Sequence, residues 1–232
     1  MTKKIRRTEI NIETRKLTII RSHGKSNPVY CRRCQKPVTA FSPVKINKMK
    51  QFSSVELIEI THGGKAVGAK DISVTSRFKH DAEFFFDREM VKANTLEIVK
   101  PLAEITFLKQ NDSPLWREGF EYELKIKPFG LFNLWGTHYL EVVSIDRAAM
   151  TIVTRKKNNL CAVWNHTLTF KKTADNETEY TDRIIFYAGK LTGLLSYFLV
   201  YSYKKRHRNW NKLLTKIQES GLSSGQRRSV GG

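Results

Sequence analysis

The sequence predicts an α+β fold in which a curved antiparallel sheet is closed by one long C-terminal helix. Four consecutive segments are rich in β-branched and aromatic residues and are separated by turn residues; they are residues 133–144, 149–154, 160–170 and 177–187. An apolar helical pattern covers residues 191–217 directly afterwards. A bent sheet with a helix across it encloses a deep apolar space, so this pattern favours binding of a hydrophobic small molecule over catalysis.

The rest of this domain comes earlier in the chain. The patterns predict a strand at residues 72–78, a helix at 81–90 that continues through 95–99 to a stop at Pro101, and strands at 103–108 and 120–126. With the final helix, this order of elements is the helix-grip arrangement, expected over residues 72–218. Residues 219–232 are rich in Gly, Ser and Arg and are expected to form a disordered basic tail.

Residues 1–70 predict a separate small module. The alternating residues 9–13 and 17–20 indicate a β-hairpin. Ser42-Pro43 indicates a helix start, because Ser is a favourable N-cap and Pro fits the first helical position. This helix to residue 51 and a second over residues 53–61 are expected to form a helix-turn-helix-like pair. The Gly-containing residues 65–71 are predicted to be the linker to the second domain.

The composition indicates a folded protein with basic ends. Hydrophobic residues make up 40% of the chain and aromatic residues 11%, which supports a core and excludes global disorder. Residues 1–70 hold 16 basic and 4 acidic residues, residues 71–203 hold 17 of each, and residues 204–232 hold 8 and 1. The basic ends suggest a polyanionic partner such as nucleic acid, with a solubilising basic surface as the alternative.

No transmembrane segment is predicted. The longest apolar run, residues 191–203, is interrupted by Thr192, Gly193 and Ser196 and is shorter than the roughly 20 residues that a spanning helix needs. The first residues are basic and lack the apolar stretch of a secretory signal. The 3 cysteines do not make a disulfide framework, so a reducing cytoplasmic location is expected.

The C-x-x-C pair Cys31 and Cys34 is a candidate zinc site. Thiolates at this spacing suit tetrahedral zinc, and His23 and His62 are the ligands within the module that would complete the set. The alternatives are a pair of small residues in a tight turn or a redox-sensitive pair. The pattern requires no cofactor.

Strand alternation assigns the side chains that face the interior. The residues predicted to line a ligand cavity are mostly large and apolar, as in small-molecule sites. They are Tyr122, Leu124, Trp135, Tyr139, Trp164, His166, Phe170, Tyr180, Phe186, Leu194 and Phe198. The same residues could equally form a filled core.

His166 and Asp182 are the candidate catalytic pair. On neighbouring strands, Asp182 would orient the imidazole of His166 and raise its pKa, as general acid–base chemistry requires. The alternative is a hydrogen-bonded polar pair that helps to fix the sheet.

The final helix carries an apolar stripe, formed by Leu191, Leu194, Leu195 and Phe198, that is expected to close the cavity. Further apolar side chains at Tyr197, Val200, Tyr201 and Tyr203 widen this surface. They make a homodimer or a contact with a membrane surface an alternative to core packing.

Residues 72–218 resemble the START-like, or SRPBCC, superfamily, and within it the polyketide cyclase/dehydrase-like ligand-binding branch. The resemblance depends on four pieces and a basic ending in the expected order: RFKHDAEFFFD, WREG before FEYELKI, WNHTLTF, TEYTDRIIF and YSYKKRHRNWNKLL. Lys79-His80-Asp81 stands where the family has an Ala-Pro turn before its first helix. The resemblance implies a helix-grip fold that binds a hydrophobic ligand.

The first module is faintly similar to small bacterial proteins with a hairpin, a C-x-x-C pair and a helix-turn-helix-like pair. Three rival functions stay open from the sequence. They are a cyclase- or hydratase-like enzyme that uses His166 and Asp182, a ligand-responsive DNA-binding regulator, and a lipid carrier at an anionic membrane surface.

Overall fold

The structure is a computed structural model that describes residues 7–12, 15–20, 49–100, 102–128 and 136–225. The chain divides into two units, Met1–Asn47 and Lys48–Gly232. In the first unit, β1 (Arg7–Ile12) and β2 (Arg15–Ile20) pair antiparallel, with Ile12 opposite Arg15. The predicted hairpin is therefore confirmed.

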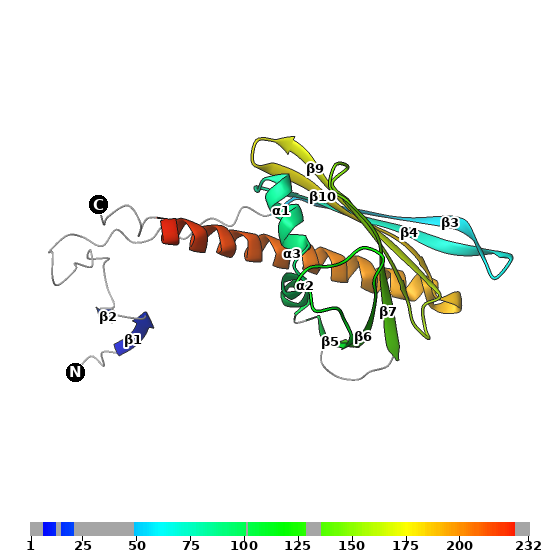
Figure 1. The fold of residues 1–232 in the computed structure, drawn as a ribbon, viewed down its shortest axis with the longest axis horizontal. Coiled ribbons are helices and arrows are strands. Elements are labelled where there is room, and N and C mark those ends of the chain that lie inside the picture. Colours follow the sequence, from blue (N-terminus) through cyan, green and yellow to red (C-terminus); the bar gives the residue numbers. More distant parts are fainter. Residues whose placement is uncertain (1–6, 13–14, 21–48, 101, 129–135, 226–232) are drawn as a thin grey trace, which may run out of the picture. The chain divides into compact units, whose positions relative to one another are not determined.

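The second unit is built on one antiparallel sheet of 8 strands in the order β3-β4-β10-β9-β8-β7-β6-β5 (Figure 1). The strands are β3 (Gln51–His62), β4 (Lys65–Phe78), β5 (Ala103–Lys109), β6 (Glu121–Pro128), β7 (Thr137–Asp146), β8 (Thr151–Lys157), β9 (Val163–Ala174) and β10 (Glu177–Tyr187). Consecutive strands from β5 to β10 are neighbours, and β10 then pairs with β4. The strands predicted after residue 72 are all present.

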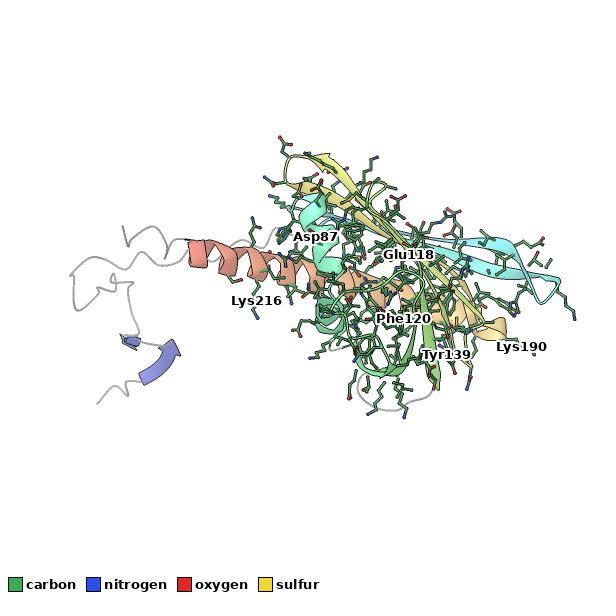
Figure 2. All side chains as sticks on the ribbon, viewed as in Figure 1. Asp87, Glu118, Phe120, Tyr139, Lys190 and Lys216 are labelled. Atoms are coloured by element: carbon green, nitrogen blue, oxygen red, sulfur yellow. The ribbon has the colours of Figure 1, made fainter. Side chains whose placement is uncertain are left out.

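The described residues of this unit also form three α-helices, α1 (Ala82–Glu89), α2 (Lys92–Val99) and α3 (Thr192–Gly225), the last preceded by a short turn of helix, η1 (Gly189–Leu191). In Figure 1, α3 runs along one face of the curved sheet, and α1 and α2 lie on the same side as α3. Lys190, just before α3, and Lys216, near its far end, mark the two ends of this helix in Figure 2. The buried side chains of α3 follow a single stripe, which includes Leu199, Tyr203, His207, Trp210 and Leu214.

Helix α1 begins where the sequence departs from the family pattern. The side chain of Asp81 caps it by accepting hydrogen bonds from the backbone N–H groups of Glu83, at 2.9 Å, and Phe84, at 3.1 Å. The helix then places Phe85 and Phe86 in the main core. Asp81 therefore acts as the N-cap that starts α1, although the Ala-Pro turn is not present.

The predicted helix at residues 53–61 is wrong, because these residues form β3. His62 pairs with Lys65. The two residues that connect them, Gly63 and Gly64, have φ angles of +58° and +77°. Two residues with positive φ make the two-residue turn of a β-hairpin, so His62-Gly63-Gly64-Lys65 reverses a strand and does not end a helix. Residues 65–71, expected to be a linker, are the first half of β4.

Two other expectations are only partly within the described residues. Of the helix expected from residue 42 to residue 51, the described residues 49–51 are not helical, and residues 42–48 lie outside the described part. The tail expected from residue 219 is helical as far as Gly225. In the described part of the chain, no helix is both long and apolar enough to cross a membrane.

Candidate ligand-binding cavity

An apolar cavity of about 170 Å³ lies beneath α3. Its walls come from α2, the β5–β7 part of the sheet and α3, through side chains such as Leu96, Val99, Ile105, Leu124 and Phe198. A single buried water needs only about 10–15 Å³ on the same scale. The space therefore suits an organic molecule with a mostly apolar surface.

A few polar side chains interrupt the apolar lining of this cavity. They include Thr95 on α2, His138 on β7, Lys156 on β8, and Ser202 and Arg206 on α3. A smaller space of about 50 Å³ has Lys156 and Arg206 in its lining as well, and adds the polar residues Glu89, Thr154 and His166. The apolar cavity thus continues towards a buried charged cluster.

The carboxylate of Asp182 on β10 is the centre of this cluster. Its Oδ1 accepts hydrogen bonds from His166 Nε2 at 2.7 Å and from the hydroxyl of Tyr180 at 2.8 Å. Its Oδ2 accepts from His207 Nε2 at 2.9 Å, and Arg206 Nη1 lies 3.5 Å from Oδ1. One carboxylate thereby joins β9, β10 and α3.

These contacts determine the charge of Asp182 and His166. Burial raises the pKa of Asp182, but Arg206 and the two histidines outweigh burial and hold that pKa well below its usual range. Burial, with the nearby charge of Lys156, lowers the pKa of His166 to about 3. Asp182 orients the imidazole, as predicted, but the expected rise in the pKa of His166 is wrong because burial has the larger effect.

The tautomer of His166 follows from its partners. A carboxylate only accepts, so Nε2 carries the proton, and Nδ1 accepts from Lys156 Nζ at 3.3 Å. Burial lowers the pKa of Lys156 to about 8, with Arg206 acting in the same direction. Burial raises the pKa of Glu89 to about 7 against the opposing charge of Arg206, with which Glu89 forms an ion pair.

Ser76, His207 and Asp182 have the connectivity of a nucleophile, a base and an acid. His207 Nδ1 accepts from the hydroxyl of Ser76 at 2.7 Å, while Nε2 donates to Asp182. All three side chains are fully buried, and none of them lines either of the two cavities described above. A substrate in those cavities would not touch this chain of hydrogen bonds, which instead ties β4 to α3 and β10.

The predicted cavity residues fall into several groups. Leu124, Tyr139, Trp164 and Phe198 line the main cavity, and His166 lines the smaller one. Phe186 lines a third, very narrow space with Trp164 and Phe198. The remaining described side chains are not in these walls: Tyr122, Phe170 and Tyr180 are buried in the core, and Leu194 is 70% exposed. Trp135 lies outside the described residues.

Two assignments of faces are corrected. On β7 the buried side chains are His138, Leu140 and Val142, so the inward face is shifted by one residue from the one predicted through Tyr139, although Tyr139 still reaches the cavity wall. Leu191, at the end of η1, and Leu194, on α3, are exposed, and the cavity is closed further along α3 by Phe198, Leu199, Ser202 and Tyr203.

Lys156 and Arg206 also line the cavity but are not among the residues predicted from the sequence. Lys156 continues the alternation of Ile152 and Thr154 on β8, so it lies on the inner face of the strand. Arg206 lies on the buried stripe of α3, seven residues after Leu199. Extending each period by one step would have found both residues, but their position in basic runs made them look like solvated charges.

The zinc prediction for Cys31 and Cys34 concerns residues outside the described part of the chain. Within the described residues, there is no group of three or more His, Cys, Asp or Glu side chains placed to hold a metal ion. Cys161 is a buried free thiol whose pKa burial raises to about 12.

The sequence matches no protein-family model and no curated protein. The structure is similar to three solved structures, each at 11% identity and a TM-score of 0.50. Norcoclaurine synthase from Thalictrum flavum, in complex with dopamine and hydroxybenzaldehyde, covers 64% of this chain and 87% of its own. A protein from Arthrobacter aurescens covers 63% and 86%, and Ara h 8.0201 covers 64% and 99%. The chain has the helix-grip fold, as the sequence resemblance predicted.

Proposed function

We propose that the protein binds a hydrophobic small molecule in the cavity between α2, α3 and the β5–β7 part of the sheet. The observation that carries this proposal is a cavity of about 170 Å³ whose walls are mostly apolar and include a few polar groups. Sites for small molecules have this composition, because apolar walls supply affinity and a few polar groups fix orientation.

The fold supports the same proposal in a general way. Norcoclaurine synthase, which has this fold, holds two small aromatic molecules, dopamine and hydroxybenzaldehyde. At 11% identity the likeness concerns the fold alone, so it suggests that a ligand lies inside and says nothing of which one.

Binding is better supported than catalysis by His166 and Asp182. The imidazole of His166 reaches the smaller cavity, but its pKa of about 3 makes it a weak base at neutral pH, and its Nδ1 is occupied by Lys156. Both carboxylate oxygens of Asp182 accept hydrogen bonds from neighbouring side chains. A cyclase- or hydratase-like activity would need a proton exchange that this arrangement disfavours.

The proposal is tested with a variant that fills the cavity. Ile126→Trp places a large ring in the wall, while Lys125→Trp adds the same ring on the exposed face of the same strand. The neutral fluorescent probe N-phenyl-1-naphthylamine should bind the unmodified protein and the Lys125→Trp variant alike. Ile126→Trp should weaken binding by at least about ten-fold. Equal binding by all three proteins would contradict the proposal.

Native mass spectrometry of the protein purified from cells gives an independent measurement. A retained species of a few hundred daltons, absent after Ile126→Trp, would support a ligand in this cavity. A ligand retained equally by both proteins would place it elsewhere.

A further inference from the structure

Lys156 places an ammonium group in the wall of the apolar cavity. Within the part of the chain that the structure describes, its Nζ makes one hydrogen bond, to His166 Nδ1 at 3.3 Å, and it lies 5.2 Å from the centre of the Trp164 ring. Among the described residues, no carboxylate forms an ion pair with it. An ammonium has three donors, so two of them remain for a molecule in the cavity.

The two nearby carboxylates make their direct contacts with side chains other than Lys156. Asp182 accepts from His166, Tyr180 and His207, and also faces Arg206. Glu89 forms its ion pair with Arg206 through Oε1, and its Oε2 is buried without a hydrogen bond among the described residues. Neither carboxylate therefore balances the charge of Lys156 by direct contact.

Other polar atoms around the ammonium also lack partners. Within the described part of the chain, Ser202 Oγ, Thr154 Oγ1 and Arg206 Nε are buried and make no hydrogen bond. All three residues line one or both of the two cavities that Lys156 lines. A buried donor without an acceptor destabilises a protein by about 1–3 kcal/mol, so acceptor atoms of a ligand would be favoured here.

The charges of the cluster determine which charge a ligand in the cavity should carry. At neutral pH, Asp182 is an anion and Arg206 and Lys156 are cations, while Glu89, with a pKa of about 7, is only partly ionised. The cluster then carries an excess of positive charge within a low-dielectric interior. An anion relieves this excess, a cation increases it, and a neutral hydroxyl leaves it unchanged.

We infer that the ligand is an amphipathic organic acid whose carboxylate binds Lys156 and whose apolar body fills the cavity beneath α3. This inference depends on the proposed function, since it names the class of ligand for the same cavity. The carboxylate accepts from the spare N–H groups of Lys156 and from Ser202 Oγ. The apolar body contacts the side chains that α2, β5 and β6 contribute to the cavity, such as Leu96, Val99, Ile105 and Leu124.

Decanoate and 1-decanol test this inference, because they share an apolar chain and differ in the charged group. Isothermal titration calorimetry at pH 7 should show decanoate binding about 10- to 100-fold more tightly, the range that charge-assisted hydrogen bonds supply. Lys156→Met should abolish this preference while 1-decanol still binds. Lys156→Arg keeps a cation and should preserve much of the preference.

Lys171→Met is the matched control. It removes one positive charge from an exposed position on β9 and should leave both affinities unchanged. If Lys171→Met lowers the decanoate affinity as much as Lys156→Met does, the preference comes from the surface charge of the protein and the inference is overturned.

The remaining outcomes separate the inference from the proposed function. Equal binding of decanoate and 1-decanol by the unmodified protein overturns the inference and leaves the cavity as a site for neutral ligands. Binding of neither molecule counts against both. If Lys156→Met does not fold, the comparison of the two ligands on the unmodified protein and on Lys156→Arg still decides.

Discussion

Helix α3 covers two interiors of opposite kind. Around Trp210 and Leu214 the space between helix and sheet is filled by aromatic rings, and Phe85 lies 5.2 Å from Trp210 and 5.1 Å from Phe170 between ring centroids. Around Phe198 and Ser202 the same helix bounds a cavity. The difference comes from the short helices, because α1 inserts Phe85 and Phe86, whereas α2 presents the smaller Thr95, Leu96 and Val99.

This contrast teaches that the cavity is not a defect of packing. The aromatic side fixes the helix on the sheet, which allows the other side to stay open without collapse. The Asp182 cluster lies between the two, with Tyr180 in the aromatic core and Lys156 in the cavity wall.

The largest effect is expected from truncation on the filled side. Trp210→Ala should lower the free energy of unfolding by about 3–5 kcal/mol, because it leaves a void among rings that cannot close around it. Phe198→Ala, on the cavity side, should cost clearly less, since that ring already has empty space on one side. Urea unfolding of the two variants measures the difference, and equal losses would break the contrast.

The next effect concerns the cluster between the two sides. His166 has a folded pKa of about 3, far below its unfolded value, so the unfolded chain binds a proton at a pH where the folded chain does not. Its contribution to stability is complete above about pH 6.5 and is lost as the pH falls from there towards 3, by about 1.4 kcal/mol per pH unit.

His166→Gln should remove this part of the slope, while the buried His207, whose pKa is also lowered, keeps its own part. Urea unfolding at pH 5 and pH 7 measures the slope for each protein. If the variant has the same pH dependence as the unmodified protein, the pKa of His166 in the folded protein must be close to its value in the unfolded chain.

The smallest effect is expected from added volume on the cavity side. Leu96→Phe should change the free energy of unfolding by less than about 1 kcal/mol, because the extra atoms enter space that is already empty. Leu214→Phe, in the filled core, should cost about 1–3 kcal/mol through overpacking. Thermal unfolding of the pair measures this, and similar losses in both would indicate that the cavity closes in solution.

The sequence predicted the helix-grip sheet because its strands after residue 72 carry strong alternation and clear turn residues. It failed at β3, where apolar residues at 55, 57, 58 and 60 fit both periods, and only the positive φ angles of Gly63 and Gly64 decide for a hairpin.

The candidate site was predicted in outline and missed in its chemistry. The contact between His166 and Asp182 followed from placing the two strands side by side. Lys156 and Arg206 fit the buried period of β8 and α3, but they stand in basic runs, a pattern that indicates solvated charges. The direction of the pKa shift of His166 is set mainly by burial. Considering only the pair His166 and Asp182 leaves burial out and therefore predicts a shift in the wrong direction.

The position of the Asp182 hydrogen bonds has a consequence for how this protein can change. The hydrogen bonds of Asp182, His166 and Ser76 hold β4, β9, β10 and the later turns of α3 together, whereas the apolar wall residues on α2, β5 and β6 take no part in them. Substitutions among those apolar residues can alter the shape of the ligand that is accepted without loosening the groups that hold the sheet and helix together. Lys156 and Arg206, which line the cavity and also contact the cluster, are constrained by both roles.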